Sequence, residues 1–156
     1  MRETGICLSM PVGSFNYRVA AIIIKDRKLL VAKSSDYPVY YTVGGTVEMN
    51  ETAEEAVIRE VLEETGYSLE VDRLLIVQER FFTVNSRKLH ELAFFYQMKN
   101  RDDMLIEDGS FTDQPPKETL HWIPIDDLPA TNIVPPMLKT LSLESIDCAR
   151  HIISRE

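Results

Sequence analysis

Residues 45–67 read GTVEMNETAEEAVIREVLEETGY. Gly45 follows Gly44, and this Gly-Gly turn leads into an acidic amphipathic helix. Thr52 is a suitable N-cap, and Glu55 stands three residues later, where a capping box needs a glutamate. Gly66 stands where a helix commonly ends in a left-handed residue. The sequence therefore predicts a helix from about Thr52 to Thr65.

The expected helix carries an apolar stripe with carboxylates at its edge. At about 100° per residue, the stripe consists of Ala53, Val57, Ile58, Val61 and Leu62. Glu60 and Glu64 lie one turn apart beside it, and Glu63 is next to them. Like charges at this spacing each destabilise a helix by roughly 0.2–0.5 kcal/mol, and its C-terminal end disfavours anions. Arg59 can pair with Glu63 but does not neutralise three carboxylates, so we expect a hard divalent cation there.

The spacing of residues 45–67 resembles the Nudix box, Gx5Ex7REUxEExGU, in which U is a bulky apolar residue. Its defining positions are met by Gly45, Glu51, Arg59, Glu60, Val61, Glu63, Glu64 and Gly66. Tyr67 occupies the last U position, and Val43 stands where many family members have proline. The resemblance implies an α/β/α sandwich with a mixed β-sheet, formed by residues 1–156 as a single Nudix hydrolase domain.

Hydrophobic runs on either side of the box predict the remaining elements. We expect strands at 15–25, 28–33, 39–43, 70–84, 89–99 and 120–123, and an edge strand or a helix extension at 149–154. A second helix is expected at 135–144, with proline in its first turn. This order predicts the α/β class, with a mixed sheet and a helix on each side.

Composition and charge indicate which kinds of partner the chain can bind and in which compartment it is expected. A chain of 156 residues with 44% hydrophobic residues suits one domain with a full core. The net charge of −8 and the absence of a basic patch argue against a nucleic-acid polymer as partner. No run approaches the ~20 apolar residues of a membrane span, and Cys7 and Cys148 are read as reduced thiols, so a cytoplasmic location is expected. The sequence leaves open the choice between a monomer and a homodimer.

The resemblance implies hydrolysis of the diphosphate bond in a nucleoside diphosphate linked to another group X, with Mg²⁺ or Mn²⁺ as cofactor. Divalent ions neutralise charge on the phosphates and activate water. The family pattern makes Glu60, Glu63 and Glu64 the metal ligands and places Glu60 and Glu63 in catalysis. Arg59 is counted with the catalytic group as the partner that orients a carboxylate. Glu51 is expected to hold the junction between loop and helix.

A small molecule carrying phosphates also needs groups that receive it. Gly44 and Gly45 would let the backbone approach the phosphates or the metal, or they form a plain tight turn. Arg18, Lys33 and Arg80 are candidates for phosphate binding, although a surface ion pair is the plainer interpretation of each taken alone. We expect Gly44, Gly45, Arg18 and Lys33 to contact the substrate.

The box does not assign the general base. Glu63, Glu91, Glu107 and Glu118 are the candidates, of which Glu107 and Glu118 fall in or beside a long polar loop where a solvated charge is the plainer interpretation. The signatures of three substrate subgroups, for NADH, coenzyme A and ADP-ribose, are absent, so the group X is not assigned. A Nudix-like regulator that binds a nucleotide without cutting it, and an acidic interaction module, are the alternatives to an enzyme.

Overall fold

The computed structural model describes residues 4–113, 115 and 117–156. The strands are β1 (Cys7–Met10), β2 (Gly13–Ile22), β3 (Ile24–Lys25), β4 (Lys28–Lys33), β5 (Tyr40–Thr42), β6 (Gly44–Thr46), β7 (Val71–Val84), β8 (Arg87–Met98), β9 (Ser110–Phe111), β10 (Thr119–Pro124), β11 (Ile133–Val134) and β12 (Arg150–Arg155). The helical elements are the α-helix α1 (Ala53–Thr65) and the 3₁₀ segments η1 (Ile125–Ala130), η2 (Pro136–Lys139) and η3 (Leu143–Ser145).

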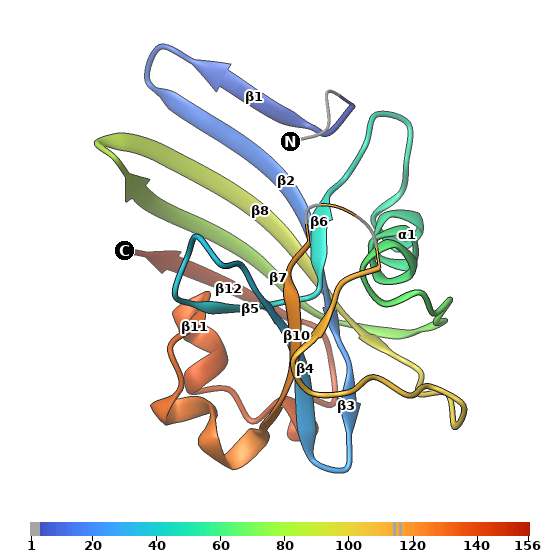
Figure 1. Ribbon diagram of the computed structural model, residues 1–156. Helices are drawn as coiled ribbons and strands as arrows, with labels where there is room; N and C mark the ends of the chain where they lie inside the picture. Colours follow the sequence, from blue (N-terminus) through green and yellow to red (C-terminus); the bar gives the residue numbers. More distant parts are fainter. Residues whose placement is uncertain (1–3, 114, 116) are drawn as a thin grey trace.

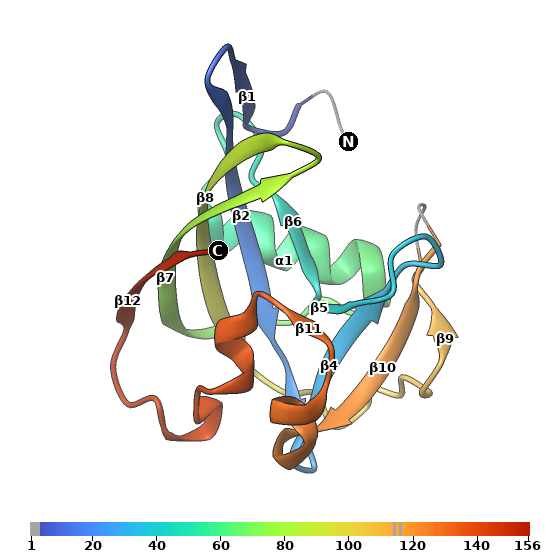
Figure 2. The same ribbon diagram turned by 90° about the vertical axis from the view of Figure 1, so that its left-hand side faces the viewer.

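The strands form two mixed sheets. The first has the order β1-β2-β8-β7-β12, with β6 also paired to β2, and its β2/β8 and β7/β12 pairs are parallel. The second has the order β11-β5-β4-β10-β9, with β3 paired to β4. Figure 1 shows α1 on one side of the sheets and the 3₁₀ segments on the other, and Figure 2 shows α1 behind β2 and β6. The α/β class with mixed strands is confirmed, although the strands are divided between two sheets.

The bounds and caps of α1 agree with the sequence prediction. The Thr52 hydroxyl accepts a hydrogen bond from the backbone N–H of Glu55, and the Glu55 carboxylate accepts one from the backbone N–H of Thr52. Gly66 ends the helix in the left-handed conformation, with φ of 77°. The N-terminal N–H groups and the C-terminal carbonyls therefore gain partners from residues adjacent in the chain.

The buried face of α1 is rotated relative to the predicted stripe. The buried residues are Ala53, Ala56, Val57 and Val61, whereas Leu62 is 45% exposed, so the prediction that Leu62 belongs to the core-facing stripe was wrong. The core contacts of α1 are made with β2, β6 and β8. Small Ala56 allows the helix to pack closely, and this rotation brings the row of Ala56, Glu60 and Glu64 towards the sheets.

The helix expected at 135–144 is also wrong, since this segment contains the short 3₁₀ segments η2 and η3. Leu138 and Leu143 are both buried in the same core cluster. Residues five apart point about 140° away from each other on an α-helix, so a continuous helix could not bury both. Of the two alternatives for 149–154, the structure shows the edge strand, β12, and not the helix extension. Among the residues that the structure describes, no helix is long and apolar enough to cross a bilayer.

Candidate active site

The site begins where β6 meets α1. Gly44 donates a backbone hydrogen bond to Glu64 Oε1 over 3.2 Å. A Cβ at Gly45 would lie 2.4 Å from the carboxylate carbon of Glu60, and one at Gly44 would lie 2.2 Å from the carbonyl oxygen of Val19. Real side chains do not approach this closely. Gly45 therefore leaves room for the Glu60 carboxylate beside β6, and Gly44 leaves room for the neighbouring strand β2. The backbone of Gly44 thus contacts Glu64, and that of Gly45 contacts Glu60. Their expected contact with the phosphates or the metal stays a prediction.

Arg59 holds the carboxylates on the first part of this helix face. Its Nε donates to Glu51 Oε1 at 2.7 Å, and its Nη2 donates to Glu51 Oε2 at 2.9 Å. Nη1 donates to Glu60 Oε1 at 2.6 Å and lies 3.6 Å from Glu63 Oε2. The hydrogen bonds to Glu51, followed by those to Glu60, raise the pKa of Arg59 above its usual value. Glu51 also accepts from the backbone N–H of Glu48, so it joins the loop to the helix as the sequence suggested.

Glu64 occupies a different environment at the far end of the same row. Burial raises its pKa to about 8, the hydrogen bond from Gly44 opposes that rise, and the charges of Glu118 and Glu60 add to it. Arg18 lowers the pKa of Glu64 slightly. The charges of Glu118 and Arg18, which belong to the neighbouring cleft, therefore act on this helix residue. Positive charge is therefore needed near Glu64 to keep it ionised at neutral pH.

Two carboxylates of this site have the surroundings that a divalent cation requires. Among residues 4–113, 115 and 117–156, no group of three His, Cys, Asp or Glu side chains forms a ready metal cluster. However, Glu64 Oε2 is buried and has no hydrogen-bond partner among the described residues, and the Glu60 carboxylate lies against the bare backbone of Gly45. Carboxylate oxygens are the ligands that Mg²⁺ prefers. The residues therefore fit a hard cation held by Glu60 and Glu64, with Glu63 attached to Arg59 beside them.

A cleft of about 370 Å³ opens next to this row. It is lined by Arg18, Val19, Ala20, Tyr41, Thr42, Arg80, Glu91, Ala93, Phe95, Glu118, Val134 and Pro135. Its polar groups come from both sheets: β2, β7 and β8 supply Arg18, Arg80 and Glu91, and β5 supplies Tyr41. The cleft thus combines cations that can bind phosphate with carboxylates that can accept a proton.

The structure brings together some of the predicted site residues and not others. Arg18, Arg80, Glu91 and Glu118 line the cleft, and Arg18 Nε lies 3.8 Å from Glu91 Oε2. The cleft lining does not include Lys33, whose Nζ lies over the ring of Tyr40 at 5.0 Å. Glu107 is likewise not a lining residue and is exposed to solvent.

Two side-chain contacts at this cleft could not be predicted from the sequence. The Tyr41 hydroxyl donates to Glu118 Oε1 at 2.6 Å, and burial together with this bond raises the pKa of Tyr41 above its usual value. Arg80 donates from Nε and Nη2 to the Glu156 carboxylate at 2.9 and 2.7 Å. Both pairs join residues more than 70 positions apart, so they depend on strand pairing and not on a local motif.

Known proteins resemble this chain in sequence and in fold. A family model described as NUDIX domain matches residues 15–143. A protein of Caenorhabditis elegans named nudix hydrolase 1 is 37% identical over 127 residues, which cover 76% of this chain and 31% of that protein. An ADP-ribose pyrophosphatase of Methanocaldococcus jannaschii is 47% identical over 60 residues, 36% of each chain. The chain spans about a third of the length of these curated relatives.

The same fold occurs in solved structures. The crystal structure of a NUDIX hydrolase from Nitrosomonas europaea superimposes with a TM-score of 0.63 and 17% identity, covering 90% of this chain and 79% of that chain. At this identity the likeness concerns the arrangement of strands and helix alone.

Proposed function

This chain belongs to the NUDIX domain family, and we propose that it is a Mg²⁺- or Mn²⁺-dependent hydrolase that cleaves the diphosphate bond of a nucleoside diphosphate linked to another group X. The family is typically dependent on divalent metal ions. The observation that carries the proposal is the row of Glu60 and Glu64, held against Gly44 and Gly45 beside a cleft with cationic and acidic walls. Residues 1–156 are proposed to act as one domain.

Substrate binding in this proposal uses the two arginines of the cleft. Arg18 is 41% exposed, so its guanidinium can receive phosphate oxygens at the cleft wall. Arg80 is only 12% exposed. Arg80 must exchange Glu156 for the substrate, because that carboxylate occupies its bidentate edge. The role proposed for Lys33 is weaker contact with the distal part of the substrate, since it lies outside the cleft lining.

The chemical step transfers a phosphoryl group to water. A bond forms between the water oxygen and one phosphorus, the bridging P–O bond breaks, and the products are a nucleoside monophosphate and the phosphate of X. When bound, a divalent ion would neutralise charge on the phosphate oxygens and acidify the attacking water. The residues that would hold it are Glu60 and Glu64, with Glu63 as the third family ligand, while Arg59 orients Glu60 and Glu63.

We assign the proton-accepting role to Glu118 among the four candidates. Glu118 lines the cleft and its charge acts on Glu64, and the Tyr41 hydroxyl fixes the position of its carboxylate. Glu91 also lines the cleft but faces Arg18, whereas Glu63 faces Arg59. A general base must reach the water that attacks the phosphorus, and position is the first criterion.

We expect Glu118→Gln to lower kcat by about 100-fold with KM changed only a few-fold, because general-base catalysis contributes roughly 10²–10⁴-fold. Glu107→Gln is the matched control, since it removes the same charge from an exposed position outside the cleft, and it should leave kcat unchanged. Steady-state kinetics on both variants measure this. Loss of activity in Glu91→Gln together with normal activity in Glu118→Gln would transfer the role to Glu91.

The reaction itself is tested by chromatographic detection of the nucleoside monophosphate product over a panel of nucleoside triphosphates, nucleotide sugars and ADP-ribose. We expect turnover of at least one compound with Mg²⁺ or Mn²⁺ and no turnover with excess EDTA, because the carboxylates of Glu60 and Glu64 repel phosphate oxygens unless a cation lies between them. The control restores activity with excess Mg²⁺. Full activity in EDTA would contradict the metal dependence.

The same panel separates the enzyme from the alternatives. Tight nucleotide binding without turnover would indicate a regulatory domain, and an absence of both would indicate an interaction module. The cytoplasmic location stays a prediction, which cell fractionation would test directly. Light scattering would decide between a monomer and a homodimer.

A further inference from the structure

A second cavity, of about 470 Å³, lies at one end of the first sheet. It is lined by Met10, Val12, Gly13, Ser14, Phe81, Phe82, Thr83, Lys88, Leu89, His90, Arg155 and Glu156. Figures 1 and 2 both show the β1–β2 turn and the β7–β8 turn at this same end of the molecule. The volume is within the range of about 300–1,000 Å³ that is usual for small-molecule sites.

The principal side chains of this cavity project from the sheet face opposite the cleft. Phe81 pairs in register with His90 on β8 and with Arg155 on β12, and Thr83 pairs with Lys88. Paired residues project to the same face, and neighbours along a strand project to opposite faces. Arg80, which precedes Phe81, is therefore directed to the other face, where it lines the cleft. Phe82 and Glu156 also line the cavity, and both contact the Arg80 guanidinium. The cavity therefore adjoins the cleft at Arg80, while its Phe81, His90 and Arg155 side chains lie on the opposite face.

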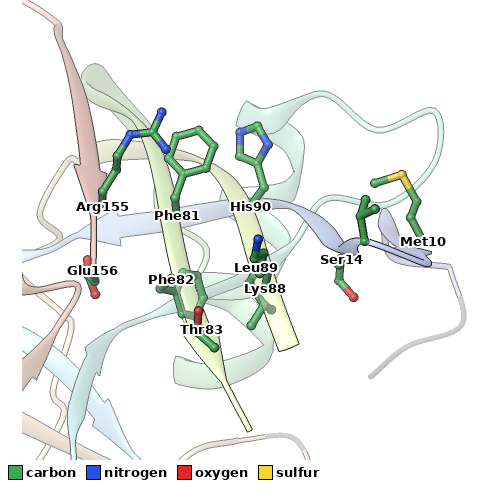
Figure 3. A pocket seen from close by; sticks show the side chains of 12 residues that line it. Met10, Ser14, Phe81, Phe82, Thr83, Lys88, Leu89, His90, Arg155 and Glu156 are labelled. Carbon is green, nitrogen blue, oxygen red and sulfur yellow. The ribbon is translucent and has the colours of Figure 1, made fainter. Parts of the chain in front are cut away.

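Three side chains from three strands form a stack along this face. The Arg155 guanidinium lies 4.3 Å from the centroid of the Phe81 ring, and the Phe81 and His90 rings are stacked with centroids 4.3 Å apart. Figure 3 shows Arg155, Phe81 and His90 in this order across the face, with Met10 beyond them. The flat face of the Arg155 guanidinium rests on the Phe81 ring. The N–H groups at its edge therefore stay available to a ligand.

The cations of the cavity stand out in an acidic chain. The net charge is −8, yet Arg155 and Lys88 both line the cavity. Within the described part of the chain, neither has a carboxylate at ion-pair distance, and the carboxylate of Glu156 is held by Arg80. Met10 and Val12, 46% and 80% exposed, supply an apolar wall beside them. Open cations next to an apolar wall complement a molecule with an anionic end and an apolar or aromatic body.

We propose that this cavity binds a small organic phosphate that carries an aromatic or apolar body, with the phosphate on Arg155 and Lys88 and the body against Met10 and Val12. Nucleoside monophosphates belong to this chemical class. Binding needs neither metal nor hydrolysis, so it can be tested whether or not the activity proposed above is found.

The test is a titration of the ¹⁵N-labelled full chain with AMP in EDTA, followed by amide chemical shifts. Inorganic phosphate and adenosine are titrated separately. The variant Arg155→Gln/Lys88→Gln removes both cations, and Arg150→Gln is the matched control, because Arg150 is an exposed arginine of the same strand outside the cavity. Met10→Ser removes apolar contact at an exposed position. Melting curves verify that each variant is folded.

In the parent, we expect AMP to shift amides of β7, β8 and β12 around the cavity and to bind more tightly than phosphate or adenosine alone. The double variant should bind AMP at least about tenfold more weakly, as expected for lost charged hydrogen bonds, and Arg150→Gln should bind like the parent. Met10→Ser should weaken AMP and leave phosphate unchanged. Shifts confined to the cleft around Arg18, parental affinity in the double variant, or equal affinity for AMP and phosphate would overturn the proposal.

Discussion

Replacing Glu60 or Glu64 with glutamine is expected to lower kcat by at least about 100-fold in each case, since electrostatic groups that stabilise a transition state commonly contribute this much. Each change removes one negative charge from a position that fits a divalent cation while keeping the size and helix propensity of the side chain. Glu64 should be the more sensitive, because its buried Oε2 has no other partner among the described residues. Steady-state kinetics with saturating Mg²⁺ measure both.

The matched control is Glu54→Gln, which removes the same charge from an exposed position in the first turn of α1 and should retain parental activity. Mg²⁺ or Mn²⁺ affinity, measured by titration calorimetry, supplies a readout that a structural role would not change. Glu60→Gln and Glu64→Gln should both bind the ion more weakly. Activity within a few-fold of the parent in either variant would show that the ligands are assigned wrongly.

Gly45→Ala is expected to lower kcat on the order of 100-fold, the loss typical of a group misplaced by about 1 Å in an active site. The new Cβ would lie 2.4 Å from the Glu60 carboxylate, which must move away. Gly45 is not among the glycines with positive φ, so alanine fits its backbone and only the flexible end of Glu60 is displaced. The melting temperature should therefore stay close to that of the parent while activity falls.

Gly66→Ala should give the opposite result. Gly66 has φ of 77°, and the nearest atom to an added Cβ is 3.6 Å away, so the space is open but the conformation is strained. A left-handed non-glycine residue costs about 1–2 kcal/mol, which for a chain of this size lowers the melting temperature by roughly 2–8 °C. Its kcat should be nearly parental. If both glycine variants lose stability and activity together, the approach of Gly45 to Glu60 serves the fold and not the reaction.

The box helix was predicted well because its signals are local. The caps at Thr52, Glu55 and Gly66 depend on hydrogen bonds between residues no more than four positions apart, and so does the pairing of Arg59 with Glu63. The position of β4 was likewise readable from a short apolar run. β12 was one of two alternatives for its segment. A motif whose partners are neighbours in the chain is visible before any tertiary contact is known.

The errors arose where a distant segment decides what is buried. Leu62 was predicted in the stripe, but the contacts of α1 with the sheets bury Ala56 in its place. The 135–144 helix gave way to two 3₁₀ segments, because the second core cluster takes both Leu138 and Leu143. Hydrophobic periodicity describes one element alone, and it does not include the shape of the surface against which that element packs.

By itself, the sequence determined the family resemblance, the caps and extent of α1, and the row of carboxylates that implies a metal. Only the tertiary structure decided which cations and carboxylates share the cleft: it includes Arg18, Arg80 and Glu118 and leaves out Lys33. It also decided that Glu64 is buried against Gly44. The physical reason is that burial and Coulomb interactions depend on distance in space, and the strand pairings that set those distances join residues far apart in the chain.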